Sequence, residues 1–235
     1  MDNNNVLLEE IDKKKKLLNL GESFPLDVKL SFIYHSNAME GNTLTLQETK
    51  VVLDRGLTVG GRTVREHIET RNTGEAFDLM LKIFEERKPL SNEIIQLFHS
   101  KIMHGLLEEP GVYRDGVELE MKEYIQNLLE KEMHPIEKAA YLYYEFIHIH
   151  PFVDGNEQVA RLLMNLYLLQ QGYPIVVLRK EEQVKYYKAL QKADRGDLSM
   201  LTRIIAENIR DTMRQLKGKT VSTRELSRFF IILGT

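Results

Sequence analysis

The chain has 235 residues, 43% of them apolar, and a formal net charge of -3. This composition supports a sizeable core and argues against disorder, and the near-neutral charge argues against a general nucleic-acid binder. The chain has no cysteine, which excludes disulfides and cysteine nucleophiles. It shows neither a signal peptide nor an apolar run of the ~20 residues that span a membrane. We therefore expect a cytoplasmic protein without a membrane or nucleic-acid partner.

Apolar spacing predicts helices along most of the chain. The first helix, Val6 to Leu18, carries a run of lysines that we interpret as a solvated face. The second, Leu26 to Met39, ends at a Gly-Asn pair. Thr45 and Glu48 predict a capping box that opens the third, to about Arg55. Further helices are expected over residues 64–87, 91–107, 118–129, 135–149, 157–171, 181–194 and 197–216.

Because no repeat or linker interrupts this pattern, the simplest expectation is an all-α bundle with one main domain. We divide the chain into an N-terminal helix (1–25), a helical domain (26–217) and a C-terminal tail (218–235). The tail ends in the apolar sequence FFIIL, which we expect to pack or self-associate. A homodimer is one possible assembly.

The segment 150–161, HPFVDGNEQVAR, lies between two of these helices. Gly155 and Asn156 stand where the second helix begins, so free backbone N–H groups form an anion site suited to phosphate. Asn156 is a natural N-cap. Asp154 is placed to hold Mg²⁺ together with phosphate oxygens. His150, with an ordinary pKa of ~6.5, suits a general base, and Arg161 could reach further phosphate oxygens.

Each of these residues also has an ordinary structural interpretation. A histidine at a helix end is often a cap or a packed residue, and Asp154-Gly155 alone would be a turn. His148 and His150 could suggest zinc, but no third ligand follows at a suitable spacing. The combination within one loop favours chemistry on a phosphate.

The loop resembles the signature of the Fic family, HPFx[DE]GNGRxxR. The resemblance extends from about Phe32 to Leu216 and includes the segments NTLTLQETK and GGRTVREH. It implies a Fic-fold helical bundle and a protein adenylyltransferase that moves AMP from ATP, with Mg²⁺, onto a Ser, Thr or Tyr hydroxyl of a target protein or of itself. The matching positions are His150, Pro151, Phe152, Asp154, Gly155, Asn156 and Arg161.

The resemblance also implies a role for each matching residue. His150 would deprotonate the target hydroxyl, and Asp154 would hold Mg²⁺. Asn156 and the loop amides around Gly155 would stabilise the α-phosphate, and Arg161 would hold the terminal phosphates. Tyr187 matches a position that lines the adenine pocket. A core tyrosine is an equally good interpretation of that residue.

The segment 36–42, SNAMEGN, resembles the inhibitory motif [ST]xxxE[GN] of the same family. Ser36 and Glu40 are four residues apart and share a helix face, and a glutamate near a helix C-terminus is disfavoured by the dipole. By resemblance, Glu40 would pair with Arg161 and deny it to the ATP γ-phosphate, which makes the resting protein autoinhibited. Without the resemblance, the residues alone favour a solvated Glu40.

Two residues of the expected nucleotide site depart from the pattern. Glu157 stands in place of a glycine and Gln158 in place of the first arginine. Losing one charged contact to the phosphate would weaken transition-state stabilisation by ~2–4 kcal/mol. Between Tyr113 and Met121 the chain also leaves little room for the β-hairpin flap of relatives, so the flap is small or missing.

These departures keep alternatives open. One is a weakened or non-catalytic Fic-fold protein that binds nucleotide or a partner. The other is an enzyme that removes AMP or transfers another phosphate-linked group, with Glu40 positioning a water.

Overall fold

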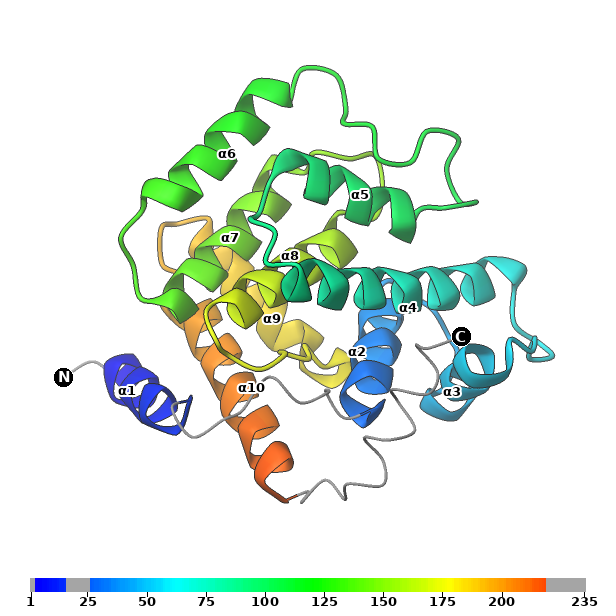
Figure 1. The fold of residues 1–235 in the computed structure, drawn as a ribbon, viewed down its shortest axis with the longest axis horizontal. Helices are drawn as coiled ribbons and strands as arrows, with labels where there is room; N and C mark the ends of the chain where they lie inside the picture. Colours follow the sequence, from blue (N-terminus) through cyan, green and yellow to red (C-terminus); the bar gives the residue numbers. More distant parts are fainter. Residues whose placement is uncertain (1–2, 16–25, 219–235) are drawn as a thin grey trace.

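The computed structural model describes residues 3–15 and 26–218, which form helices and no strand (Figure 1). The all-α prediction is therefore confirmed for this part of the chain. The elements are α1 (Asn3–Lys15), α2 (Leu26–Met39), α3 (Leu46–Arg55), α4 (Val64–Glu85), α5 (Asn92–Ile102), α6 (Glu118–Glu130), α7 (Pro135–Ile149), α8 (Asn156–Gln170), the 3₁₀ turn η1 (Lys180–Glu182), α9 (Gln183–Ala193) and α10 (Ser199–Gly218).

Helix α8 is the centre of the bundle. It packs against α2, α4, α5 and α7, and from position 158 to position 169 every residue is buried. A helix buried on all sides belongs to the core of a domain rather than to its surface. The N-terminus of α8, where the 150–161 loop ends, is therefore fixed by packing from several directions.

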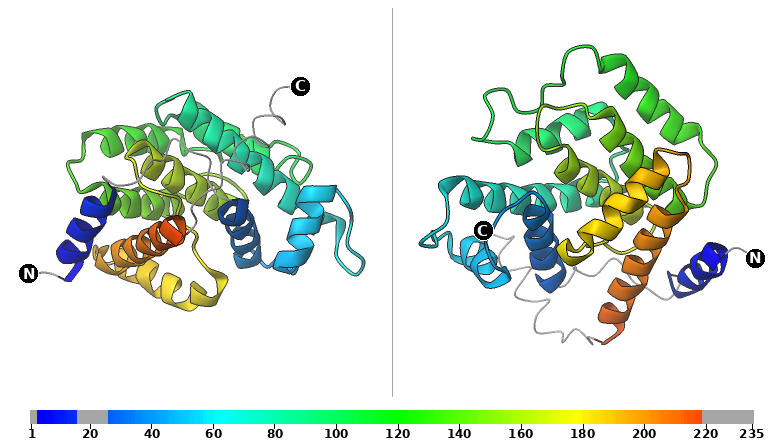
Figure 2. Two further views of the ribbon diagram at one scale, coloured as in Figure 1. Left: turned by 60° about the horizontal axis from the view of Figure 1, so that its bottom comes forward. Right: turned by 180° about the vertical axis from the view of Figure 1, so that it is seen from behind.

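The two ends of the molecule are formed by different helices. Figure 2 shows α1 and α3 at opposite ends, with α1 beside α10. Lys15, on the predicted lysine face, is half-buried, and its ammonium lies 4.1 Å from the ring centroid of Tyr173 and donates to the carbonyl of Gln171. None of the helices described is long and apolar enough to cross a membrane.

Local signals placed the helix starts better than the helix ends. The capping box of Thr45 and Glu48 is present, and a second box formed by Thr63 and Glu66 opens α4. The helix that was expected to continue to residue 107 ends at Ile102, and α4 ends two residues before the expected position 87. The expected C-terminal tail lies outside the described residues, except for Gly218.

The segment 103–117 connects α5 to α6 through turns and contains no strand. It occupies the position at which the resemblance implies a β-hairpin flap. Gly111 takes a left-handed backbone conformation there, with φ of 95°. The expectation of a missing flap holds for this described segment.

Candidate functional site

The 150–161 loop turns the chain from α7 into α8. His150 ends α7 with a left-handed backbone (φ 51°), and Gly155 precedes α8 with φ of 74°. Few residues other than glycine adopt such angles without cost. The turn leaves the N-terminus of α8 without a side-chain cap, so its backbone N–H groups and dipole are available to an anion.

Asn156 does not cap α8, contrary to the expectation from sequence. It is the first residue of the helix, and its side chain bridges back across the loop. Its Oδ1 accepts from the Phe152 amide at 2.9 Å, and its Nδ2 donates to the Phe152 carbonyl at 2.8 Å. The same Nδ2 lies 3.2 Å from Nε2 of His150. When this amide donates, His150 Nε2 is an acceptor, as a general base must be.

His99 of α5, a buried histidine that the sequence did not indicate, packs against the loop and hydrogen-bonds to it. The His99 ring stacks on Phe152 with centroids 3.7 Å apart and an interplanar angle of 3°. Its Nδ1 accepts from the Gly111 amide at 2.7 Å, so its Nε2 carries the proton and donates to the Asp154 carbonyl at 3.1 Å. Burial lowers the pKa of His99 to about 4. A lone histidine among apolar residues carries no sequence signal for this role.

Arg114 holds the backbone at the other side of the loop. Its Nε donates to the carbonyl of His150 at 2.7 Å, and its Nη2 donates to that of Ile149 at 3.2 Å. Its own amide donates to the Pro151 carbonyl at 2.8 Å. The last carbonyls of α7 are thereby satisfied by a cation, which is favourable at a helix C-terminus. Arg114 belongs to the GVYR segment, but its function as a clamp was not predicted.

Asp154 points its carboxylate outward, with 51% of the side chain exposed. One oxygen accepts from the Gly155 amide at 2.8 Å, and the other lies 3.1 Å from Arg65 of α4. A single accessible carboxylate fits a Mg²⁺ ion that takes its other ligands from phosphates and water. Within residues 3–15 and 26–218 there is no group of three or more histidine and carboxylate side chains for an all-protein metal cage.

Arg161 is fully buried, and its guanidinium is held by the segment 36–40, SNAME. Its Nε donates to Ser36 Oγ at 2.8 Å, and its Nη2 donates to the Ser36 carbonyl at 3.1 Å. The same Nη2 lies 2.5 Å from Glu40 Oε1. The structure thus brings together Ser36, Glu40 and Arg161 across more than a hundred residues of sequence. Glu40 is exposed to solvent, as the residues alone suggested, but it is paired with Arg161.

The two departures from the family pattern lie on the first turn of α8. Glu157 Oε2 is 3.5 Å from Arg161 Nη1. Burial, with a contribution from the nearby charge of Glu40, raises the pKa of Glu157. Gln158 is buried, with 5% of its surface exposed.

Tyr187 lies on α9 and is 42% exposed, so the interpretation as a core tyrosine is wrong. Its hydroxyl accepts from Gln183 Nε2 at 3.2 Å, and the same nitrogen donates to the carbonyl of Met39 at 3.2 Å. Since Glu40 follows Met39 directly, Tyr187 is linked to the end of α2. Its position beside the segment 36–40 is compatible with a base-binding role.

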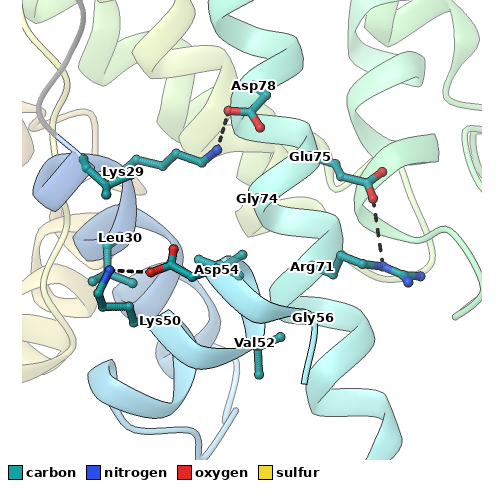
Figure 3. Close-up of a pocket in the computed structure, with 12 residues that line it drawn as sticks. Lys29, Leu30, Lys50, Val52, Asp54, Gly56, Arg71, Gly74, Glu75 and Asp78 are labelled. Atoms are coloured by element: carbon teal, nitrogen blue, oxygen red, sulfur yellow. Dashed lines mark hydrogen bonds and ion pairs between the residues drawn. The ribbon is translucent and has the colours of Figure 1, made fainter. Parts of the chain in front are cut away.

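A separate surface hollow lies between α2, α3 and α4 (Figure 3). Two of its cations are already neutralised, because Lys29 lies 2.5 Å from Asp78 and Lys50 lies 2.5 Å from Asp54. The hollow includes no residue of the 150–161 loop. The hollow is therefore separate from the loop at which the sequence predicts phosphate chemistry.

Comparison with known proteins identifies relatives of the chain. Residues 89–168 match the model of the Fic/DOC family. The protein adenylyltransferase Fic of Nematostella vectensis is 32% identical over 243 residues, which cover 92% of this chain and 56% of that protein. That of Culex quinquefasciatus is 31% identical over 250 residues, with 93% and 48% covered. The chain spans about half the length of these curated relatives.

The fold has close counterparts among solved structures. Fic-1 from C. elegans superimposes with a TM-score of 0.82 at 27% identity, covering 92% of this chain and 72% of that one. This agreement extends over nearly the whole described bundle.

Proposed function

Because this chain belongs to the Fic/DOC family, we propose that it is a protein adenylyltransferase, a nucleotidyltransferase that moves AMP from ATP to a Ser, Thr or Tyr hydroxyl. The acceptor is a target protein or the chain itself. A clamp between Glu40 and Arg161 holds the enzyme in an autoinhibited state.

One observation carries the proposal. His150 and the uncapped start of α8 lie in one loop, where Nδ2 of Asn156, the first residue of α8, is 3.2 Å from His150 Nε2. A base beside an anion site is the arrangement that transfer of a phosphate-linked group requires. The Asn156 bridges and the His99 stack pre-organise it, so the loop need not reorganise when charge develops.

The reaction can be followed atom by atom. His150 Nε2 accepts the proton of the target hydroxyl, whose oxygen forms a bond to the α-phosphorus of ATP. The bond from that phosphorus to the bridging oxygen breaks, and pyrophosphate leaves. Asn156 and the backbone N–H groups that follow Gly155 donate to the oxygens on which charge builds.

The remaining residues bind and orient the substrate. When Mg²⁺ is bound, it neutralises phosphate charge, and Asp154 is the side chain that would hold it. Tyr187 is proposed to contact the adenine. Arg161 would bind the terminal phosphates once it is released from Glu40, and Gln158 would offer a neutral hydrogen bond in place of an ionic one.

The test is self-modification with ATP labelled at the α-phosphate, in the presence of MgCl₂. The wild type, Glu40→Gly, and Glu40→Gly combined with Glu157→Gly and Gln158→Arg are compared, and His150→Ala in the last background is the negative control. We expect little label in the wild type and most in the triple variant. A folded triple variant that binds ATP but transfers no label would refute the proposal.

The departures at Glu157 and Gln158 favour a second candidate, a Fic-fold protein that binds nucleotide without turnover. Glu157 faces the arginine that should bind phosphate. In that case label appears only when Glu157→Gly and Gln158→Arg are present, whatever residue stands at position 40. Removal of AMP by the native chain would appear instead as loss of label from a modified substrate.

A further inference from the structure

The guanidinium of Arg161 has two carboxylate neighbours that come from different parts of the chain. Glu40, just after α2, lies 2.5 Å from Nη2. Glu157, on α8 itself, lies 3.5 Å from Nη1. Nη1 is buried and makes no hydrogen bond to any residue in the described part of the chain, so Glu157 is its electrostatic partner.

The two contacts differ in what can break them. Glu40 is 121 residues distant in sequence, so its contact with Arg161 depends on how the end of α2 packs against α8. Glu157 is four residues before Arg161 on the same helix, where side chains lie on one face. Since α8 is buried in the core, the second contact persists however α2 moves.

The charges around Arg161 also determine whether a terminal phosphate can bind there. The Arg161 side chain is 2% exposed, and one cation faces two carboxylates there. A buried cation is strongly destabilised when it loses its partners, so it retains one carboxylate when the other leaves. With Glu157 ionised, the net charge of this cluster is negative at the place where a terminal phosphate would have to bind.

We infer that Glu157 is a specificity-determining residue that locks Arg161 from within its own helix and discriminates against the terminal phosphates of a nucleoside triphosphate. The inference rests on the proposed function for the identity of the ligand. If Glu157 has this role, removing Glu40 alone does not relieve the inhibition. Removing Glu40 alone leaves Arg161 paired with Glu157, and both carboxylates must go before the guanidinium, which Ser36 still hydrogen-bonds, lacks an anionic partner and can take a phosphate.

The first test compares binding of ATP and of AMP by calorimetry in MgCl₂. The variants are wild type, Glu40→Gly, Glu157→Gln and the pair together. The ratio of the two dissociation constants measures the contribution of the terminal phosphates. Each single change should raise the preference for ATP only slightly, and the pair should exceed the product of the singles by about tenfold, a coupling typical of residues in contact. A full gain in Glu40→Gly alone would overturn the inference.

The second test does not depend on nucleotide binding. Phenylglyoxal modifies accessible arginine, and mass spectrometry reports the rate at Arg161. We expect slow labelling in the wild type and in both single variants, and fast labelling in the pair. Fast labelling in Glu40→Gly alone would refute the lock, whereas the expected labelling without any nucleotide binding would refute only the proposed function.

The substitution Glu157→Gln distinguishes an ionic contact with Arg161 from a purely structural role of Glu157. Glutamine has the same shape but no charge. If the carboxylate only complements the helix dipole, adding Glu157→Gln to Glu40→Gly would lower the melting temperature without speeding the labelling of Arg161. Glu123→Gln, on the exposed face of α6, is the matched control for a loss of one acidic charge. It should leave both the ATP preference and the labelling unchanged.

Discussion

The buried imidazole of His99 should make the protein lose stability as the pH falls below 6.5. An unfolded chain binds a proton at His99 near the ordinary pKa of 6.5, whereas the folded protein does so only near 4. Between these values the unfolded state binds more protons, so the free energy of unfolding decreases as the pH falls. Each unit of difference between the two pKa values corresponds to ~1.4 kcal/mol, so this one residue lowers the free energy of unfolding by about 3 kcal/mol in total.

The structure explains why the folded protein resists protonation of His99. The ring is 1% exposed and stacked on Phe152. Its Nδ1 is the acceptor of the Gly111 amide, and protonation would remove that acceptor and leave two donors face to face. The contact to Asp154, in contrast, needs a donor and survives.

The measurement is urea unfolding of the wild type and His99→Gln at pH 7, 6, 5 and 4.5, followed by circular dichroism. His148→Gln, at an exposed histidine, is the matched control. The wild type should be the more stable protein at pH 7, and its advantage over His99→Gln should shrink by ~1.4 kcal/mol for each unit below 6.5. An advantage that stays constant down to pH 4.5 would show that His99 is not held neutral by the fold.

Three further changes test the loop and its supports. Arg114→Ala should lower kcat for AMP transfer at least ~10-fold with little change in the KM for ATP, because it frees the backbone of His150; an equal rise in KM would argue against a positioning role. Gly155→Ala should cost about 1–2 kcal/mol in urea unfolding, because φ is 74° and a Cβ would meet the Met103 side chain; an unchanged midpoint would contradict this. Thr63→Ala should cost ~1 kcal/mol through loss of a capping box, and a loss below the error of the measurement would mean that the box is not stabilising.

Interactions within a few residues could be predicted from the sequence because spacing alone determines them. The capping box of Thr45 and Glu48 follows from a separation of three residues, and the order of α7, loop and α8 follows from apolar periodicity and a glycine. The box at Thr63 shows the same signal and was overlooked. The site loop was recognised from the residue types within twelve consecutive positions.

Contacts between distant segments required the packed bundle. His99 meets the carbonyl of Asp154 across 55 residues, and no periodicity of α5 indicates that partner. Asn156 was expected to cap α8, but the turn at Gly155 directs its side chain back to Phe152. Each outcome depends on the direction in which a side chain projects after the helices have packed.

The sequence by itself determined the all-α class, the position of the 150–161 loop and the residues that we propose to contact phosphate. Only the tertiary structure decided how the charges pair. Arg161 was expected to meet Glu40, and the packing of α8 added Glu157 on the other side of the same guanidinium. The reason is physical: helix formation depends on neighbours in sequence, whereas the partners of a buried charge depend on which groups the core brings within a few ångströms of it.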